Sequence, residues 1–169
     1  MTQDNRVHTT PAGRAVQPCL SIPDTRHSPK GVYSVRLRLS AADAQPYISF
    51  IDEAMRRVLV QSQISTRDEG AAPRMKAARV PYITEASGTV VLPFKIKADS
   101  NGGRTKKRGP QLFNERGELA PGLAIEDGAI ITVRFVVSPF CTGFGAGVTL
   151  HLRSVQLIEP APTAMQAMQ

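Results

Sequence analysis

The sequence predicts a mainly β fold, a barrel with one accessory α-helix and an irregular N-terminal arm. Several segments alternate apolar and polar residues with a period of two, which is typical of half-buried strands. A single segment has helical periodicity instead, and the connections between these segments are rich in Gly and Pro. The 169 residues suffice for one domain with a buried core. The pattern alone leaves a β-sandwich open as the alternative to a barrel.

Three of the predicted strands keep strict alternation. They cover residues 32–39, 89–97 and 130–137, and their apolar faces include Tyr33 and Phe94. Because successive side chains of a strand point to opposite faces, one face of each should lie in the core and the other at the surface.

The last predicted strand, residues 148–158, carries an irregularity. Its apolar residues keep period two up to Leu152 and resume at Val155, so the phase slips by one residue. Such a slip predicts a β-bulge around Arg153 and Ser154. Bulged and strongly bent strands are typical of small barrels, which favours a barrel here.

Residues 44–63 are predicted to be helical, because their apolar residues form one stripe. Asp43 is the expected N-cap, and Pro46 is expected in the first turn, where a missing N–H costs little. We expect residues 1–30 to form an irregular basic arm, residues 31–159 the folded domain, and residues 160–169 a neutral flexible tail.

The charge of the chain indicates a polyanionic partner. Lys and Arg number 21 against 14 Asp and Glu, a net charge of +7, and nucleic acid is the polyanion that such proteins most commonly meet. No apolar run is long enough to cross a bilayer, and no signal peptide is recognisable. Without such segments we expect no membrane association. Cys19 and Cys141 lie far apart without a metal-binding pattern and are expected to be free thiols, which is typical of a cytoplasmic protein.

The polar faces of the strands and the loop after residue 97 carry the candidate binding residues. These cations could contact phosphates, and two Phe residues in the hairpin before the last strand could stack on bases. The alternative interpretation is that strand exteriors carry Lys and Arg to discourage edge pairing, and that either Phe closes the barrel end. The nucleic-acid-binding candidates are Arg36, Arg38, Lys95, Lys97, Arg104, Lys106, Lys107, Arg108, Arg134, Phe140, Phe144 and Arg153.

The sequence offers no support for catalysis. The three His residues lack metal-ligand spacing, and the acidic residues at 115–127 lie in a connection punctuated by Gly and Pro. No nucleotide-binding motif of the Walker type is present, and the Gly-rich stretch 143–147 leads into a strand instead of a helix. We therefore expect a protein that is not an enzyme and that needs no cofactor or metal.

The order of several short motifs resembles that of the single-stranded DNA-binding proteins of tailed bacteriophages. Phe94-Lys95-Ile96-Lys97 leads into a basic loop, Glu126-Asp127-Gly128 opens the next strand, Ser138-Pro139-Phe140 ends it, and the final segment is GVTLHLRSVQLI. The resemblance covers roughly residues 30–159. It implies a five-stranded OB-fold barrel with an added helix, sequence-tolerant binding of single strands, and roles in phage DNA replication, recombination and repair.

The same resemblance implies protein partners, and this chain differs from the family at its C-terminal segment. Members are often homodimers, and many recruit phage replication proteins through an acidic C-terminal tail. The last ten residues of this chain contain no Asp or Glu, so recruitment by such a tail is not expected. Phosphate and stacking contacts do not separate DNA from RNA, so weaker RNA binding stays open. The alternative function is that of a basic virion or architectural protein that binds duplex DNA or other proteins.

Overall fold

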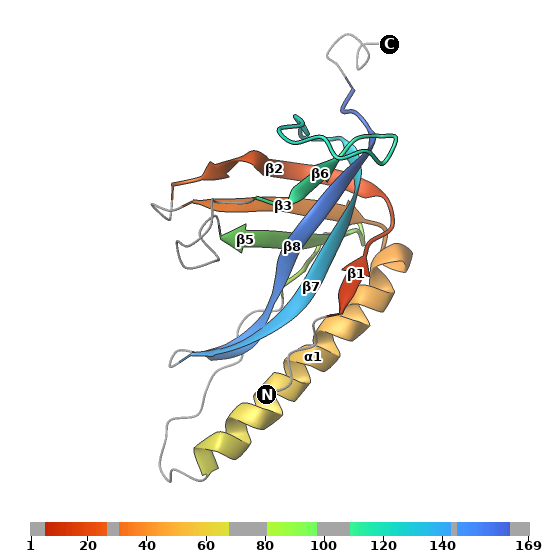
Figure 1. Ribbon diagram of the computed structural model, residues 1–169. Helices are drawn as coiled ribbons and strands as arrows, with labels where there is room; N and C mark the ends of the chain where they lie inside the picture. Colours follow the sequence, from red (N-terminus) through yellow and green to blue (C-terminus); the bar gives the residue numbers. More distant parts are fainter. Residues whose placement is uncertain (1–5, 27–30, 68–80, 98–108, 143–144, 163–169) are drawn as a thin grey trace.

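The computed structural model describes residues 6–26, 31–67, 81–97, 109–142 and 145–162. Within these ranges the chain is built mainly from strands, with one long helix (Figure 1). In chain order the elements are β1 (Val7–Thr9), β2 (Gly13–Asp24), β3 (Val32–Leu39), α1 (Ala41–Arg67), β4 (Ile83–Thr84), β5 (Val90–Lys97), β6 (Gln111–Phe113), β7 (Ile130–Thr142) and β8 (Gly145–Glu159).

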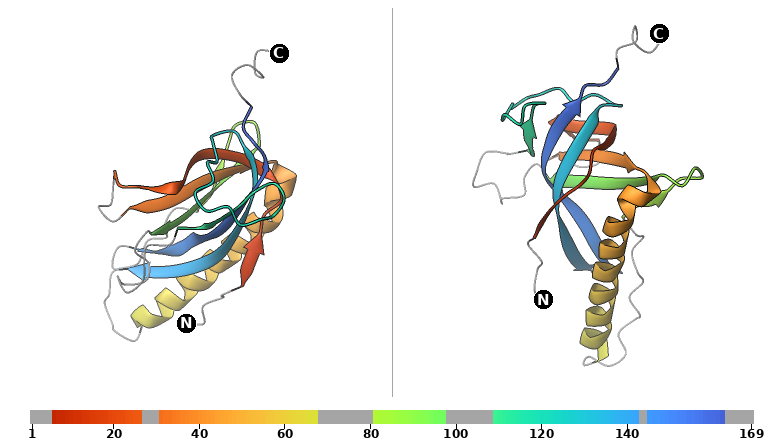
Figure 2. Two further views of the ribbon diagram at one scale, coloured as in Figure 1. Left: turned by 45° about the horizontal axis from the view of Figure 1, so that its top comes forward. Right: turned by 90° about the vertical axis from the view of Figure 1, so that its right-hand side faces the viewer.

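Five of the strands close into a ring. The order is β2, β3, β5, β8 and β7, and β7 returns to pair with β2. Neighbours in the ring are antiparallel except β5 and β8, which pair in parallel at Lys95 and His151. The short strands β1, β4 and β6 add to β7, β5 and β8 respectively. This closed ring with one helix confirms the OB-type barrel expected for the chain (Figures 1 and 2).

The core lies inside this ring and follows the predicted alternation. Val35 and Leu37 of β3 are buried, as are Leu92 and Phe94 of β5. At the centre, the rings of Phe94 and Phe135 are 4.9 Å apart between centroids and tilted to one another, an arrangement that aromatic pairs favour. The strand segments predicted at 32–39, 89–97 and 130–137 are thus confirmed, with β7 extending further, to Thr142.

The predicted bulge in the last strand is also present. In the β7–β8 ladder Arg134 is opposite Ser154, but the next residue, Phe135, is opposite Leu152, so Arg153 has no counterpart. The extra residue allows Leu152 and Val155 both to point inward, and both are fully buried. The one-residue slip in the apolar pattern of the last strand therefore corresponds to a β-bulge in β8.

The prediction that residues 1–30 form an irregular arm is wrong for residues 6–26, which the structure describes. β1 pairs with β7, and β2 is a full member of the ring, so the barrel begins before residue 31. The register of β2 against β3 shifts twice, between Val16 and Cys19 and between Cys19 and Asp24. Gln17 has a φ of 49°, which turns the chain locally. These irregularities break the period of two, so alternation could not reveal this strand.

The helix begins earlier than predicted. Its N-cap is Ser40 instead of Asp43, because the Ser40 Oγ accepts a hydrogen bond of 3.2 Å from the Asp43 N–H. Asp43 lies in the first turn, where its carboxylate interacts favourably with the positive end of the helix dipole, and Pro46 lies in the second turn. Ile51 and Met55 are buried where α1 packs along β7 and β8 (Figure 1).

Candidate nucleic-acid interface

The outer surfaces of β3 and β5 form one continuous face. The ladder places Ser34 opposite Lys95, Arg36 opposite Pro93, and Arg38 opposite Val91. Because the residues between them are buried in the core, these side chains point outward. In OB folds the second and third barrel strands, which β3 and β5 are in chain order, form the surface that binds oligonucleotides. The β3–β5 face below means Ser34, Arg36, Arg38, Val91, Pro93, Lys95 and Lys97.

One end of this face is strongly cationic. Lys95 and Lys97 are exposed, and the parallel pairing brings His151 of β8 beside Lys95. Burial lowers the pKa of His151, and the charges of Arg153, Lys95 and Lys97 lower it further. The imidazole is therefore neutral at pH 7 and is surrounded by cations. An anion placed here would be attracted by several side chains at once.

The two arginines of β3 differ in their surroundings. Arg36 is exposed and makes no ion pair with any residue that the structure describes. Arg38 is only partly exposed, and its guanidinium lies 2.8 Å from the Glu85 carboxylate. Arg36 is thus the freer of the two for a phosphate, whereas Arg38 already has an anionic partner.

Of the predicted cations of β7 and β8, Arg153 lies on the strand next to this face and Arg134 on the strand beyond it. Arg134 and Arg153 are exposed at the bulge, where Arg134 is opposite Ser154 and Arg153 immediately precedes it. Arg153 influences His151 and so belongs with the cationic end of the face. Arg134 lies one strand further around the barrel, beside Thr9 of β1.

Phe140 lies near the end of β7 in the outward phase. Its neighbour Pro139 is opposite the buried Val148, while Phe140 itself is opposite Gly147, which has no side chain to cover the ring. Phe140 is partly buried and is absent from the set of side chains packed against the core. The pairing therefore turns the partly buried ring of Phe140 outward. The remaining candidates lie outside the described residues: Arg104, Lys106, Lys107, Arg108 and Phe144.

The binding candidates predicted from the sequence do not include two residues of this region, Glu85 and Arg14. Arg14 is exposed on β2 directly opposite Arg38, within the segment that was expected to be irregular. Glu85 lies in the turn between β4 and β5, and its contact with Arg38 joins residues 47 positions apart. No local sequence pattern indicates the pairing of Glu85 with Arg38. For Arg14, the alternation of Gly13, Arg14 and Ala15 is a weak signal of a strand.

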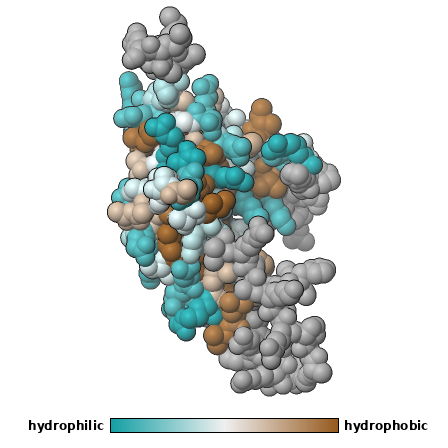
Figure 3. All heavy atoms as spheres, turned by 180° about the vertical axis from the view of Figure 1, so that it is seen from behind, coloured by the Kyte–Doolittle hydropathy of each residue, from teal (hydrophilic) through white to brown (hydrophobic). Residues whose placement is uncertain are grey.

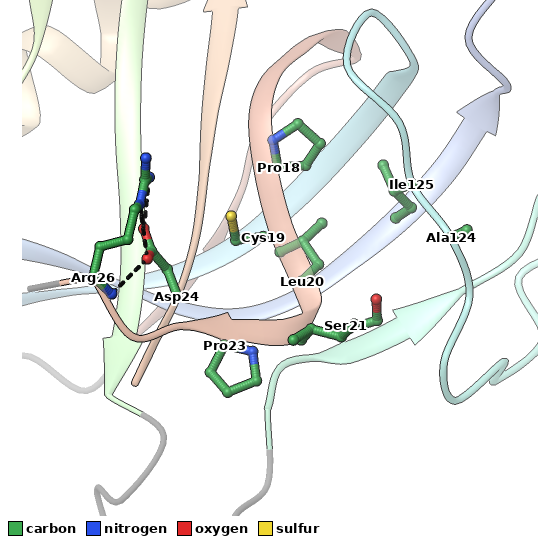
Figure 4. A pocket seen from close by; sticks show the side chains of 10 residues that line it. Pro18, Cys19, Leu20, Ser21, Pro23, Asp24, Arg26, Ala124 and Ile125 are labelled. Atoms are coloured by element: carbon green, nitrogen blue, oxygen red, sulfur yellow. Dashed lines mark hydrogen bonds and ion pairs between the residues drawn. The ribbon is translucent and has the colours of Figure 1, made fainter. Parts of the chain in front are cut away.

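A pocket lies on the bulged half of β2, where its lining residue Cys19 is paired with Ser34 of β3. It has a volume of about 400 Å³ and mostly apolar walls, including Leu20 and Ile125, with the Asp24–Arg26 ion pair at one side (Figure 4). None of the predicted binding residues lines it.

On the face seen from behind, the described residues form a mixture of hydrophilic and apolar areas (Figure 3). Among the described residues, no group of three His, Cys, Asp or Glu side chains is placed to hold a metal ion. No helix within the described ranges is long and apolar enough to cross a membrane.

Solved structures provide the comparison for this arrangement. The crystal structure of gp2.5, a single-stranded DNA-binding protein encoded by bacteriophage T7, superposes with a TM-score of 0.81 at 22% identity, covering 94% of each chain. The chain has the fold of this protein. The single-stranded DNA-binding protein from bacteriophage Enc34 matches with a TM-score of 0.60 at 16% identity, over 90% of this chain and 80% of that one.

The Enc34 protein is also known in complex with single-stranded DNA. That structure matches with a TM-score of 0.60 at 15% identity and covers 90% of this chain and 86% of that chain. No family model and no curated protein sequence matches the chain. The likeness therefore lies in the three-dimensional fold, which these sequences share at low identity.

Proposed function

We propose that this protein binds single-stranded DNA without sequence preference and protects it during phage DNA replication, recombination and repair. The observation that carries the proposal is the cationic β3–β5 face, on the barrel surface that OB folds use for oligonucleotides. The fold is shared with two phage single-stranded DNA-binding proteins, one of them solved with single-stranded DNA.

The binding chemistry needs only phosphate neutralisation and stacking. Lys95, Lys97 and Arg36 supply exposed cations along the face, and Arg153 adds charge next to Lys95 through the His151 neighbourhood. Phe140 supplies a ring on which a base can stack whatever its identity. Because neither contact reads a base edge, binding is expected to be independent of sequence. The DNA is left chemically unchanged, so the protein is not an enzyme.

Loops at the ends of the barrel complete the proposed site. In OB folds the connections between the first two and the last two barrel strands flank the ligand. Here these are the β2–β3 and β7–β8 connections. The basic loop that follows β5 contributes the further cations Arg104, Lys106, Lys107 and Arg108, and the β7–β8 hairpin contributes Phe144. We propose that these residues also contact the strand.

A titration with labelled oligonucleotides tests the proposal. Oligo(dT), an RNA of the same length and a duplex are compared at two salt concentrations, with and without Mg²⁺. We expect the tightest binding to oligo(dT), weaker binding to RNA, a steep loss of affinity with salt, and an intact label after incubation. Preferential binding of the duplex would favour a virion or architectural protein instead, and cleavage of the label would indicate a nuclease.

The same proposal includes a setting and partners. We propose that the protein acts in the cytoplasm of a phage-infected host cell, as a homodimer and beside phage replication proteins. The neutral segment 160–169 provides no charge for recruiting them. Sedimentation of the purified protein with and without oligo(dT) measures the oligomeric state.

A further inference from the structure

Arg14 and Arg38 are directly opposed on neighbouring strands of the barrel. They are paired in the antiparallel ladder of β2 and β3, and the next pair along the ladder is Ala15 with Leu37. Ala15 and Leu37 are fully buried, so the alternation turns both arginines to the outer surface. Like charges directly opposite one another destabilise a strand pair. This position therefore favours a nearby anion.

A carboxylate of the protein meets this need in part. The Glu85 Oε1 accepts hydrogen bonds from the Arg38 Nε at 2.8 Å and from the Thr89 Oγ1 at 2.9 Å. These two hydrogen bonds lower the pKa of Glu85, the larger effect coming from Arg38, so the carboxylate is charged at neutral pH. Arg14 makes no ion pair with any residue in the described ranges. One of the two guanidinium charges is thus compensated and the other is not.

The backbone of a tight turn holds Glu85 in this place. The Glu85 N–H donates to the Thr89 carbonyl at 2.8 Å, and the Gly88 N–H donates to the Glu85 carbonyl at 2.9 Å. Gly88 has a φ of 91°, which a glycine adopts without strain. The β4–β5 hairpin that contains this turn extends past the beginning of α1 (Figure 2, right). The carboxylate is therefore positioned at the end of the β3–β5 face by the fold itself.

We propose that Arg14 and Arg38 form a phosphate-binding position which Glu85 occupies in the free protein, and that a bound single strand displaces Glu85 from Arg38. The inference rests on the proposed function, because the phosphate belongs to the bound nucleic acid. The Arg38–Glu85 ion pair is partly exposed, and ion pairs that solvent reaches contribute little to stability. A phosphate between two guanidinium groups would compensate both charges, which Glu85 does not.

The position lengthens the proposed binding surface. Ser34, which is opposite Lys95, lies four residues from Arg38 along β3, or about 13 Å at the usual rise of a strand. Arg36 lies between them. A DNA single strand that contacts Lys95 at one end and Arg38 at the other would cross the whole β3–β5 face. Glu85 would lower the affinity for this DNA by competing with a phosphate for Arg38.

The variant Glu85→Gln tests the competition. Its amide oxygen can still accept the Thr89 hydrogen bond, but it no longer carries the charge that holds Arg38. We expect about two- to fivefold tighter binding of oligo(dT) at low salt, the range expected for one exposed ion pair. Glu115→Gln is the matched control, because it changes the net charge equally at an exposed turn after β6, away from this face.

Two further variants make the outcome decisive. Combining Glu85→Gln with Arg38→Gln should abolish the gain in affinity. Arg14→Gln alone should reduce the slope of log K against log salt by about 0.7, the value for one phosphate contact on a single strand. Melting curves verify that each variant is folded. If Glu85→Gln does not fold, the salt slope of Arg14→Gln alone tests the inference.

The inference is overturned if Glu85→Gln binds no more tightly than Glu115→Gln, if the gain survives the loss of Arg38, or if Arg14→Gln leaves the slope unchanged. A wild-type protein that binds no single strands at any salt concentration would overturn the proposed function and this inference together. Wild-type binding without a difference between the two Gln variants would overturn this inference alone.

Discussion

Lys95 and Lys97 provide a direct test of the proposed electrostatic surface. Both are exposed at the end of β5, and their positive charges help to lower the pKa of the neighbouring His151. In the double variant Lys95→Gln/Lys97→Gln the strand keeps its inward residues, so the barrel should remain intact. If each lysine contacts one phosphate, the slope of log K against log salt should fall in magnitude by about 1.4, or about 0.7 for each contact. Between 50 and 200 mM salt, two such contacts account for about a sevenfold change in affinity.

The assay is a fluorescence titration of labelled oligo(dT) at four or five salt concentrations. The matched control is Arg56→Gln/Arg57→Gln, which removes two charges from α1, where both arginines are paired with Glu53. The control should lower affinity slightly without changing the slope by a full contact. An unchanged slope in the lysine variant would refute the assignment of these residues. Equal changes in the two variants would show that net charge alone governs binding.

Three further outcomes are expected. Phe140→Ala should reduce single-strand affinity by about 1–3 kcal/mol with little change in melting temperature, whereas a large drop in melting temperature would mean that the ring packs in the barrel end. Phe135→Ala should instead lower the free energy of unfolding by about 3–5 kcal/mol, as measured by urea denaturation, because its ring is 1% exposed and packs on Phe94. Burial and nearby cations lower the pKa of His151 in the folded state. The unfolded chain therefore binds the proton more readily, and stability should fall as the pH drops below about 6.5 towards the folded pKa. His151→Gln should remove this part of the pH dependence, and an unchanged profile would exclude His151 as its source.

The strands that sequence alone predicted well share one physical property. β3 has one face in the core and a more exposed face opposite it along its whole length, and β5 has the same alternation from Leu92 onward, so every second residue reports burial. The bulge in β8 was equally visible, because Leu152 and Val155 on either side of it are both fully buried. Regular alternation and a single slip in it are local signals, which a sequence displays directly.

What the sequence concealed depends on irregular backbone or on distant partners. β2 bends at Gln17 and shifts register twice, so its inward residues, such as Ala15 and Leu20, do not follow a period of two. The helix start was displaced because Ser40 and Asp43 are both good capping residues, and only the hydrogen bond between them shows which is the cap.

The candidate site was predictable residue by residue but not as an arrangement. Alternation placed Arg36, Lys95 and Lys97 on polar faces, and the structure agrees. Which of these faces adjoin depends on strand order and register, which follow from closure of the barrel. The pairing of Arg38 with Glu85 depends in addition on a turn in another part of the chain. Long-range register therefore decides which charges are free and which are already paired.

The position of β8 has a consequence for how the chain acquires its structure. β8 is hydrogen-bonded to β5, β6 and β7, and its parallel partner β5 precedes it by a long stretch of sequence. During synthesis, the ring cannot close until Glu159 has left the ribosome. Pairings between such distant segments form slowly, because the entropy of loop closure must be lost before the contacts are gained. The other ring strands are therefore expected to keep open edges until β8 has been made, and such open edges are prone to aggregation during that interval.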